Sequence, residues 1–475
     1  AAGGVGDDGA DEAALLSTKA RSISLPKIVP DGINTQDPLG PQLTVYGPPE
    51  IDPSAVYVPP EFGPNSYLWI GWPAFPYVEN LRPPTEVVVE MITEICKCDF
   101  SKPGCTAVKI QVIPSGLDGA KRAIAQAKLP KSCPIYYSVQ ERDDIWIRDM
   151  GPVFTKIDCT GIRGCHPLGL VDFNFDYWGA PALGTDEFTR LEASLDTKIY
   201  ESLNGTKILS HIIAEGGNRE FNGKGTLLMN LDVEISRNIK YSWGKERSEE
   251  EYKRVFGVKK IVWITGVPTN DFLAEFPVKA YIDGQKQYAY NWGTGGHVDE
   301  IVRFVDASTV LVASVTLPEA RLDPYKLVKK DMEVLDNIYD QLKQATDQDG
   351  KPLKVIKVPA APVYIQELKP GDVAYDIWYS PLKSFQRTVE AGGKIHGIAA
   401  TSYLNFVYTN QVVLVPKYYV AGDPIFGKDS IKKSDDDFKA LMEKLFPTRR
   451  VAQVNPLTIN IGGGGMHCIT AHQYR

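Results

Sequence analysis

The chain has 475 residues, of which 43% are hydrophobic and 23% are charged, and its formal net charge at pH 7 is −7. This is the composition of a globular protein, and no apolar run reaches the roughly 18 residues that indicate a transmembrane helix. The acidic balance argues against nucleic acid or an anionic membrane as a partner and favours a cationic substrate.

The order of polar and apolar segments predicts an arm followed by one large domain. Residues 1–58 are rich in proline and glycine, and we expect little regular structure in this arm. Short apolar strands then alternate with amphipathic helices, which predicts an α/β fold in a single catalytic domain over 59–475. Strands are expected at 151–157, 207–213, 261–267, 301–306, 309–315 and 411–416, and helices at 248–257, 331–346 and 436–446.

Six of the seven cysteines lie in one cysteine-rich insertion at about 96–165. Reduced thiols or a zinc site are the alternatives to disulfides, but the spacing fits no common zinc motif and only His166 is near. Such short cysteine-rich loops favour an oxidising compartment, so we expect a secreted protein. Six cysteines allow 15 connectivities, of which we expect Cys159–Cys165, Cys98–Cys105 and Cys96–Cys133.

The seventh cysteine, Cys468, follows four consecutive glycines near the end of the chain, in "NIGGGGMHCITAHQ". A buried cysteine after a glycine turn is one interpretation. A reactive thiol is the other, and it needs an acid–base partner. The segment "WGTGGHVDEIVRF" offers one, because His297 and Asp299 are two residues apart, a spacing that places both side chains on one face of a strand.

Taken together, these segments resemble one enzyme family. "PPEFGPNSYLWIGWP", "WIRDMGP", "EGGN", "GHVDE", "SYLNF" and "GGGGMHCIT" occur in the order found in agmatine deiminases and bacterial, Porphyromonas-type peptidylarginine deiminases. The resemblance covers nearly everything after residue 57. It implies the pentein fold of the guanidine-modifying superfamily, a five-bladed pseudo-symmetric α/β propeller, and an enzyme that needs no metal or other cofactor.

The resemblance also assigns roles to individual residues. Asp149 and Asp299 would hold the guanidinium through paired N–H bonds, Cys468 would attack its carbon, and His297 would act as the general acid and base. Glu215 would orient His297 or the substrate. Further substrate contacts are expected from Trp146, Asn405 and Asn222, the last at a position where relatives carry aspartate.

The substrate is less well defined by the sequence. The segment 171–181 is similar to that of agmatine-type enzymes, and it lacks the arginines that hold a terminal carboxylate in peptidylarginine relatives. Oxidised cysteines would nevertheless place the enzyme outside the cytosol. We therefore expect conversion of arginine in peptides or proteins to citrulline and ammonia, through a covalent thiouronium on the cysteine. The alternatives are conversion of agmatine to N-carbamoylputrescine, a cysteine peptidase, and a pentein that only binds. Oligomeric state and calcium dependence stay open.

Overall fold

The computed structural model describes residues 51–74, 77–78, 81–142, 144–162, 164–179, 191–273, 277–376, 379 and 393–474, all within one compact unit, Pro48–Arg475. Most of the expected arm, residues 1–50, lies outside this part of the chain. Regular structure begins with η1 (Pro53–Ala55) and β1 (Val56–Tyr57), and β1 pairs antiparallel with β5 (Val153–Ile157). The last residues of the expected arm therefore take part in a sheet.

A three-stranded motif occurs five times among the described strands. In each repeat the middle strand is antiparallel to one neighbour and parallel to the other. The repeats are β21 (Thr470–Tyr474), β2 (Asn65–Gly71) and β3 (Ala107–Val112); β5, β6 (Leu168–Asn174) and β7 (Thr206–Ile213); β8 (Glu220–Phe221), β9 (Thr226–Asn230) and β10 (Lys260–Ile264); β13 (Val302–Phe304), β14 (Thr309–Ser314) and β15 (Lys354–Pro359); and β18 (Val407–Tyr408), β19 (Val412–Pro416) and β20 (Arg450–Val454).

Helices connect the parallel strands of each repeat, as parallel pairing requires. They are α2 (Pro84–Ile95); α6 (Leu195–Ser202); α7 (Leu231–Asn238), η4 (Ile239–Tyr241) and α8 (Lys245–Phe256); α10 (Leu317–Leu322) and α11 (Val328–Gln344); and α13 (Asp429–Leu445). The first repeat is extended by η2 (Pro114–Gly116), α3 (Leu117–Gln126) and β4 (Ile135–Val139). A further sheet contains β11 (Val278–Ile282), β12 (Gln285–Asn291), β16 (Ile365–Leu368) and β17 (Ile395–Ile398).

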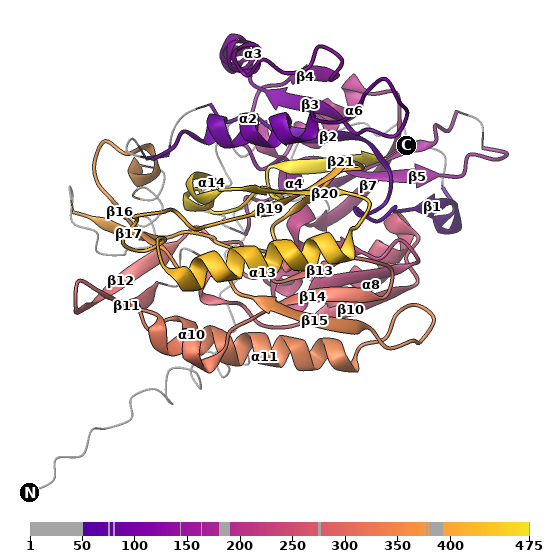
Figure 1. Cartoon of the computed structure of the whole chain (residues 1–475). Coiled ribbons are helices and arrows are strands. Elements are labelled where there is room, and N and C mark those ends of the chain that lie inside the picture. Colours follow the sequence, from indigo (N-terminus) through magenta and orange to yellow (C-terminus); the bar gives the residue numbers. More distant parts are fainter. Residues whose placement is uncertain are drawn as a thin grey trace, which may run out of the picture. The chain divides into compact units, whose positions relative to one another are not determined.

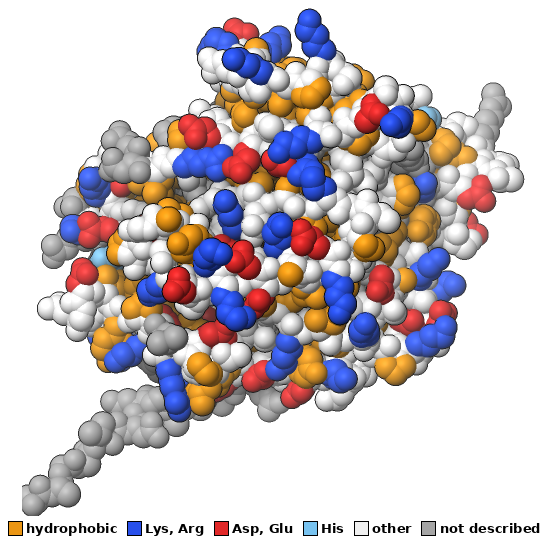
Figure 2. All heavy atoms as spheres, viewed as in Figure 1, with side chains coloured by type: hydrophobic (Ala, Val, Ile, Leu, Met, Phe, Trp, Pro, Cys, Tyr) orange, Lys and Arg blue, Asp and Glu red, His pale blue; other side chains and the backbone are white. Residues whose placement is uncertain are grey.

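The middle strands are apolar because both of their faces are covered. Every residue of β9 and β19 is buried, and so are the first five residues of β14. The long helix α11 packs on β14 and β15, while α13 packs on β19 and β20 (Figure 1). The outward faces of these helices are polar, and Figure 2 shows positive and negative side chains intermingled over this side of the molecule. Among the described residues, no helix has the length and apolar character needed to span a membrane.

The predicted elements are found with shifted boundaries. The strand expected at 301–306 is shortened to β13, because Ile301 belongs to the short helix α9 (Val298–Ile301). The helix expected at 436–446 begins seven residues earlier, at Asp429, in a mostly polar stretch that buries little beyond Ile431. Hydrophobic periodicity gives no signal over such a turn.

Three disulfides join the six clustered cysteines with the predicted pairing. Cys96–Cys133 links the end of α2 to the segment before β4, and Cys98–Cys105 closes the loop between α2 and β3. Cys159–Cys165 closes the β5–β6 connection. The cysteine-rich region therefore belongs to the first repeat and to the opening hairpin of the second, and Cys468 is left free.

Candidate active site

The predicted catalytic side chains occupy corresponding positions in different repeats. Each lies a few residues before the first strand of a repeat: Asp149 on α4 (Ile147–Met150) before β5, Glu215 beside η3 (Gly216–Asn218) before β8, His297 and Asp299 before β13, Asn405 before β18, and Cys468 before β21. These loops converge, because side chains up to 169 positions apart in the sequence come within contact distance.

Cys468 lies against an amide and two carboxyl groups. Its Sγ is 3.2 Å from Asn405 Nδ2, 3.6 Å from Glu300 Oε1 and 3.7 Å from Asp299 Oδ2, and the residue is only 5% exposed. Burial raises the pKa of the Cys468 thiol well above its usual value, and the neighbouring acidic side chains of Asp299, Glu300 and Asp149 raise it further. These surroundings favour the protonated thiol, and a nearby cation would favour the reactive thiolate.

His297 lies within a network of carboxylates. Its Nε2 is 3.1 Å from Glu215 Oε2, and its backbone N–H donates to Asp271 Oδ2 at 2.8 Å. Burial lowers the pKa of His297, but Asp149, Glu215 and Asp299 together raise it to about 9. The ring is consequently an imidazolium at neutral pH. Its Nδ1, 3.9 Å from Asp149 Oδ2, has no hydrogen-bond partner among the described residues.

Glu215 is held in place by a buried arginine. Arg237 Nε donates to Glu215 Oε1 at 2.7 Å, and Arg237 Nη2 donates to the Thr294 carbonyl at 2.6 Å. Burial raises the pKa of Glu215, but Arg237 and His297 bring it down to about 2. Glu215 therefore stays ionised and orients the imidazolium, as expected from the sequence.

Asp149 is fixed by one backbone and one side-chain donor. Its Oδ1 accepts the Gly217 N–H at 2.8 Å, and its Oδ2 accepts Trp178 Nε1–H at 2.9 Å. Gly217 has to be glycine, since a Cβ there would lie 2.3 Å from His297 Nδ1. Burial raises the pKa of Asp149, whereas the His297 imidazolium opposes that change.

The glycine run brings the backbone into contact with the walls of the site. A Cβ on Gly465 would lie 2.3 Å from Asn405 Oδ1, and one on Gly464 would lie 2.7 Å from Trp146 Cζ3 and 3.1 Å from Cys468 Sγ. Gly463 has φ 107°, a conformation that favours glycine. The glycines therefore bring Cys468 close to Asn405 and Trp146, both expected from the sequence to line the site.

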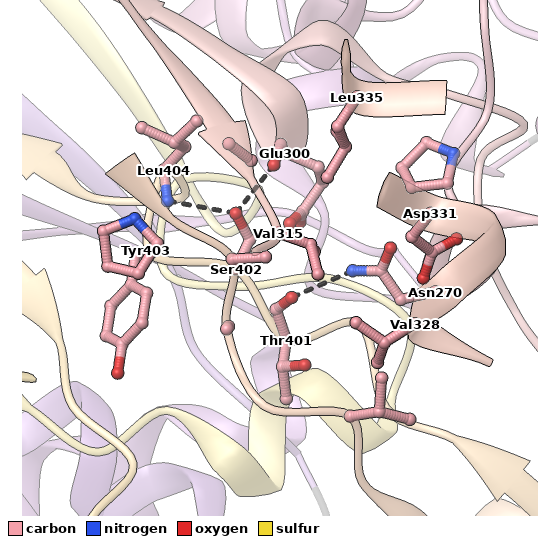
Figure 3. A pocket seen from close by; sticks show the side chains of 16 residues that line it. Asn270, Glu300, Val315, Val328, Asp331, Leu335, Thr401, Ser402, Tyr403 and Leu404 are labelled. Carbon is pink, nitrogen blue, oxygen red and sulfur yellow. Dashed lines mark hydrogen bonds between the residues drawn. The ribbon is translucent and has the colours of Figure 1, made fainter. Parts of the chain in front are cut away.

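Asn405 is positioned by a segment that is tied to α9. Ser402 Oγ donates to the Glu300 carbonyl at 2.7 Å and accepts the Leu404 N–H at 3.0 Å, while Asn270 Nδ2 donates to the Thr401 carbonyl at 2.9 Å. These four residues and Glu300 line a pocket (Figure 3). The hydrogen bonds fix the backbone from which the Asn405 amide reaches Glu300 Oε1 at 2.9 Å.

Two expectations about the site need correction. His297 and Asp299 are not on a strand, because His297 caps α9 and Asp299 lies within it. Gly295 and Gly296, both at positive φ, make the turn that precedes this helix. Asn222 is not brought to the cluster either. Its side chain stabilises a turn, accepting the N–H groups of residues 224 and 226 and donating to the carbonyl of residue 307.

Several residues of the network were not predicted. Glu300 adjoins Asp299 in "GHVDE", and His467 adjoins Cys468, so their motifs could have indicated both. Arg237 and Asp271 lie in no recognised motif and are identified only by their contacts with Glu215 and His297.

Within the described part of the chain, two groups of side chains have the spacing of a metal site. One is Asp299, Glu300 and Cys468, and the other is Glu61, His467 and His472. The carboxylate oxygens of Glu61 already accept bonds from two arginines. In the first group Cys468 Sγ contacts both acidic side chains directly.

Known proteins show the same sequence pattern and fold. Agmatine deiminase from Medicago truncatula is 24% identical over 421 residues, covering 88% of this chain and 96% of the relative. Agmatine deiminase from Stutzerimonas stutzeri is 25% identical over 422 residues, covering 88% and 95%. The solved agmatine deiminase of Enterococcus faecalis superposes with a TM-score of 0.65 at 22% identity, covering 91% of this chain and 99% of that one. The model of the Porphyromonas-type peptidyl-arginine deiminase family matches residues 57–473, and the chain belongs to this family.

Proposed function

We propose that the protein hydrolyses the guanidinium group of a small cationic alkylguanidine, with agmatine as the candidate substrate, to a ureido product and ammonia. The observation that carries this proposal is the buried thiol of Cys468 in contact with the carboxyl groups of Asp299 and Glu300. The individual relatives described above are agmatine deiminases, which supports agmatine over arginine in peptides as the substrate.

Two of the buried polar atoms left without partners are oxygens that can accept hydrogen bonds from a guanidinium. Asp299 Oδ1 and Glu300 Oε2 are buried acceptors without a hydrogen bond, and His297 Nδ1 is a buried donor without one. A buried polar group without a partner is costly, by about 1–3 kcal/mol. The N–H groups of a guanidinium can satisfy the two acceptors, and its positive charge offsets the excess of carboxylates.

The same cation activates the nucleophile. A guanidinium beside Cys468 favours loss of the thiol proton to solvent, and the resulting thiolate bonds to the central carbon. His297 donates a proton to one nitrogen, the C–N bond breaks and ammonia leaves, so that a thiouronium remains on Cys468. Water then adds to this carbon as His297 takes up one of its protons. The C–S bond breaks, the second water proton passes to the leaving sulfur, and the ureido product and the free thiol are released.

A cysteine peptidase is disfavoured by the same charges. Peptide hydrolysis produces an oxyanion, which needs hydrogen-bond donors beside the thiol. Here Asp299 and Glu300 lie within 3.7 Å of Cys468 Sγ. A pentein that only binds is disfavoured because a thiol in contact with Asp299 and an imidazolium in contact with Glu215 are both present.

Arginine in peptides or proteins is the second candidate substrate, supported by the three disulfides. Disulfides persist in oxidising compartments, and we infer on this basis that the protein is secreted. An acidic surface could attract arginine-rich chains, but the face shown in Figure 2 carries positive and negative side chains interspersed and does not support this.

We also infer that the five repeats are the blades of a propeller around the site, which accounts for the convergence of their loops.

The deciding experiment measures ammonia release from agmatine, free arginine and an arginine peptide blocked at both ends. We expect kcat/KM to be at least ten-fold higher for agmatine, about 1.4 kcal/mol in transition-state free energy. A ten-fold preference for the blocked peptide would favour the second candidate, and no release from any of the three would refute both. Cys468→Ala should abolish turnover and leave the thermal unfolding temperature nearly unchanged.

A further inference from the structure

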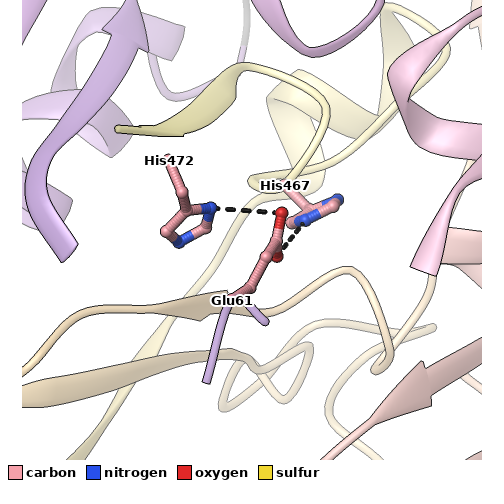
Figure 4. Close-up of side chains that lie close together, drawn as sticks. All are labelled: Glu61, His467 and His472. Atoms are coloured by element: carbon pink, nitrogen blue, oxygen red, sulfur yellow. Dashed lines mark hydrogen bonds and ion pairs between the residues drawn. The ribbon is translucent and has the colours of Figure 1, made fainter. Parts of the chain in front are cut away.

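Behind the thiol, a histidine bridges two carboxylates. His467 Nδ1 is 2.7 Å from Asp299 Oδ2, and His467 Nε2 is 2.7 Å from Glu61 Oε2. Glu61 lies between His467 and His472 (Figure 4). All three members of the row Glu61, His467 and Asp299 are largely buried.

The far end of this row is a fixed anion. Arg148 Nη1 lies 2.5 Å from Glu61 Oε1, and Arg303 Nη2 lies 2.8 Å from Glu61 Oε2. Burial raises the pKa of Glu61, but Arg148, His467 and His472 hold it well below its usual value. Protonating Glu61 would weaken two buried ion pairs, so Glu61 stays charged and anchors the imidazole.

The two short contacts also constrain the protons. A neutral imidazole has one N–H and one lone pair, so it can donate to only one of two carboxylates. In the other contact a lone pair of the ring nitrogen would face a lone pair of the carboxylate oxygen at 2.7 Å, which is repulsive unless a further proton lies between the two atoms. Burial and the positive charges of Arg148 and Arg303 lower the pKa of His467 and oppose a second proton fixed on the ring. The two short contacts nevertheless require one proton more than a neutral ring and two carboxylates hold, and the three groups share it.

The contact between His467 and Asp299 determines which carboxylate oxygen of Asp299 is left for the site. Because Asp299 Oδ2 is bound to His467, Asp299 Oδ1 is the oxygen left without a partner. Burial raises the pKa of Asp299, but the hydrogen bond and charge of His467 lower it below its usual value. His467 thus both turns the carboxylate and keeps it ionised.

We propose that Glu61 and His467 are positioning residues that orient and ionise Asp299 for binding the guanidinium group of the substrate. This inference rests on the proposed function, because it assigns the guanidinium to Asp299. Neither residue touches the reacting atoms, so both act through Asp299.

The test compares two replacements of His467 that differ in where they place an amide. His467→Asn can still donate from near the Nδ1 position to Asp299, whereas His467→Gln places its amide near the Nε2 position and loses that donor. His472→Gln is the matched control, because His472 is also buried and also contacts Glu61. Its other contacts are with Arg148 and the Tyr408 carbonyl, and none is with Asp299.

We expect His467→Gln to raise KM by about 10- to 100-fold, as loss of a hydrogen bond to a charged group implies, with a smaller change in kcat. The acid limb of kcat/KM should move to higher pH, because Asp299 loses the donor that lowers its pKa. His467→Asn should recover most of the loss, and His472→Gln should stay within about three-fold of wild type with an unmoved acid limb. Equal effects of the two His467 variants, or an acid-limb shift in His472→Gln, would overturn the inference.

A binding measurement separates this inference from the proposed reaction. Calorimetry with guanidinium chloride and with agmatine on Cys468→Ser protein gives a Kd without turnover, and adding His467→Gln to it should raise that Kd by about 10- to 100-fold. An unchanged Kd would refute the positioning role even if the wild type is active. If His467→Gln does not fold, Glu61→Gln is measured in its place, with the same shift of the acid limb expected.

Discussion

The protonation states of the two carboxyl groups beside the thiol can be distinguished by chemistry at Cys468. Asp299 Oδ2 and Glu300 Oε1 lie 3.7 Å and 3.6 Å from Sγ, so distance alone predicts equal effects on the thiolate. Their titrations differ, however. Burial, Asp299 and Asp271 raise the pKa of Glu300 well above its usual value, whereas the pKa of Asp299 is lowered by His467 despite its burial. Asp299 is therefore the charged neighbour and Glu300 the neutral one.

Asp299→Asn should consequently activate the thiol, and Glu300→Gln should not. One charge at about 4 Å is worth about 4 kcal/mol at an effective dielectric constant of about 20, which is about a thousand-fold in the thiolate population. A less basic thiolate is also a weaker nucleophile, with a Brønsted coefficient of about 0.4–0.5. The net acceleration of alkylation expected for Asp299→Asn is about 50-fold, against less than about three-fold for Glu300→Gln.

The assay is alkylation by iodoacetamide at pH 8, followed as the mass gain of the intact protein without reductant. Because the other six cysteines form disulfides, the reagent reports on Cys468 alone. Thermal unfolding of both variants serves as the control for folding. Equal acceleration by the two substitutions, or a larger one for Glu300→Gln, would refute the assigned charges.

Further predictions concern pH, disulfides and the glycine run. The pKa of His297 is raised from 6.5 to about 9, so kcat should fall as the pH rises through about 9. The free energy of unfolding in urea should decrease as the pH rises from 6.5 to about 9. A kcat and an unfolding free energy that stay constant up to pH 10 would contradict this. The stabilisation by His297 is complete below pH 6.5. Replacing Cys96–Cys133 by serines should cost about 4 kcal/mol in urea unfolding, against about 2 kcal/mol for the shorter loop of Cys159–Cys165; the reverse order would argue against the loop-entropy account. Gly465→Ala should lower kcat/KM by at least about ten-fold, because the added methyl group would displace Asn405 and a loss of about 1.4 kcal/mol in transition-state stabilisation is enough for that change. Gly119→Ala should retain activity, because open space surrounds Gly119.

The sequence predicted those parts of the structure that depend on local patterns. Buried middle strands such as β14 and β19 are apolar runs that any strand criterion detects. The pair Cys159–Cys165 is close in sequence, so a short loop was enough to suggest it. The two-residue strands β8 and β18 leave no such pattern, because they are defined only by their partners.

The catalytic set was predictable from motifs, and its support was not. Cys468, His297 and Glu215 each lie in a recognisable segment, and the structure brings them into one network. Asn222 lies in a recognisable segment too, yet its amide is used within its own turn. Arg237 supports Glu215 from the helix α7, where nothing in the surrounding sequence distinguishes it from a surface arginine.

The position of Glu61 shows why such support depends on the whole fold. Glu61 and His467 are 406 positions apart, and they meet because the last strand, β21, pairs with the first repeat's middle strand, β2 (Figure 1). That pairing places the segment after the glycine run beside the segment before β2. This one strand pair therefore both places Cys468 at the site and brings in the carboxylate behind His467. The motifs "PPEF" and "MHC", at opposite ends of the domain, therefore belong to one arrangement. The pairing of β2 with β21 fixes both the Cys468 thiol and Glu61, which acts on Asp299 through His467.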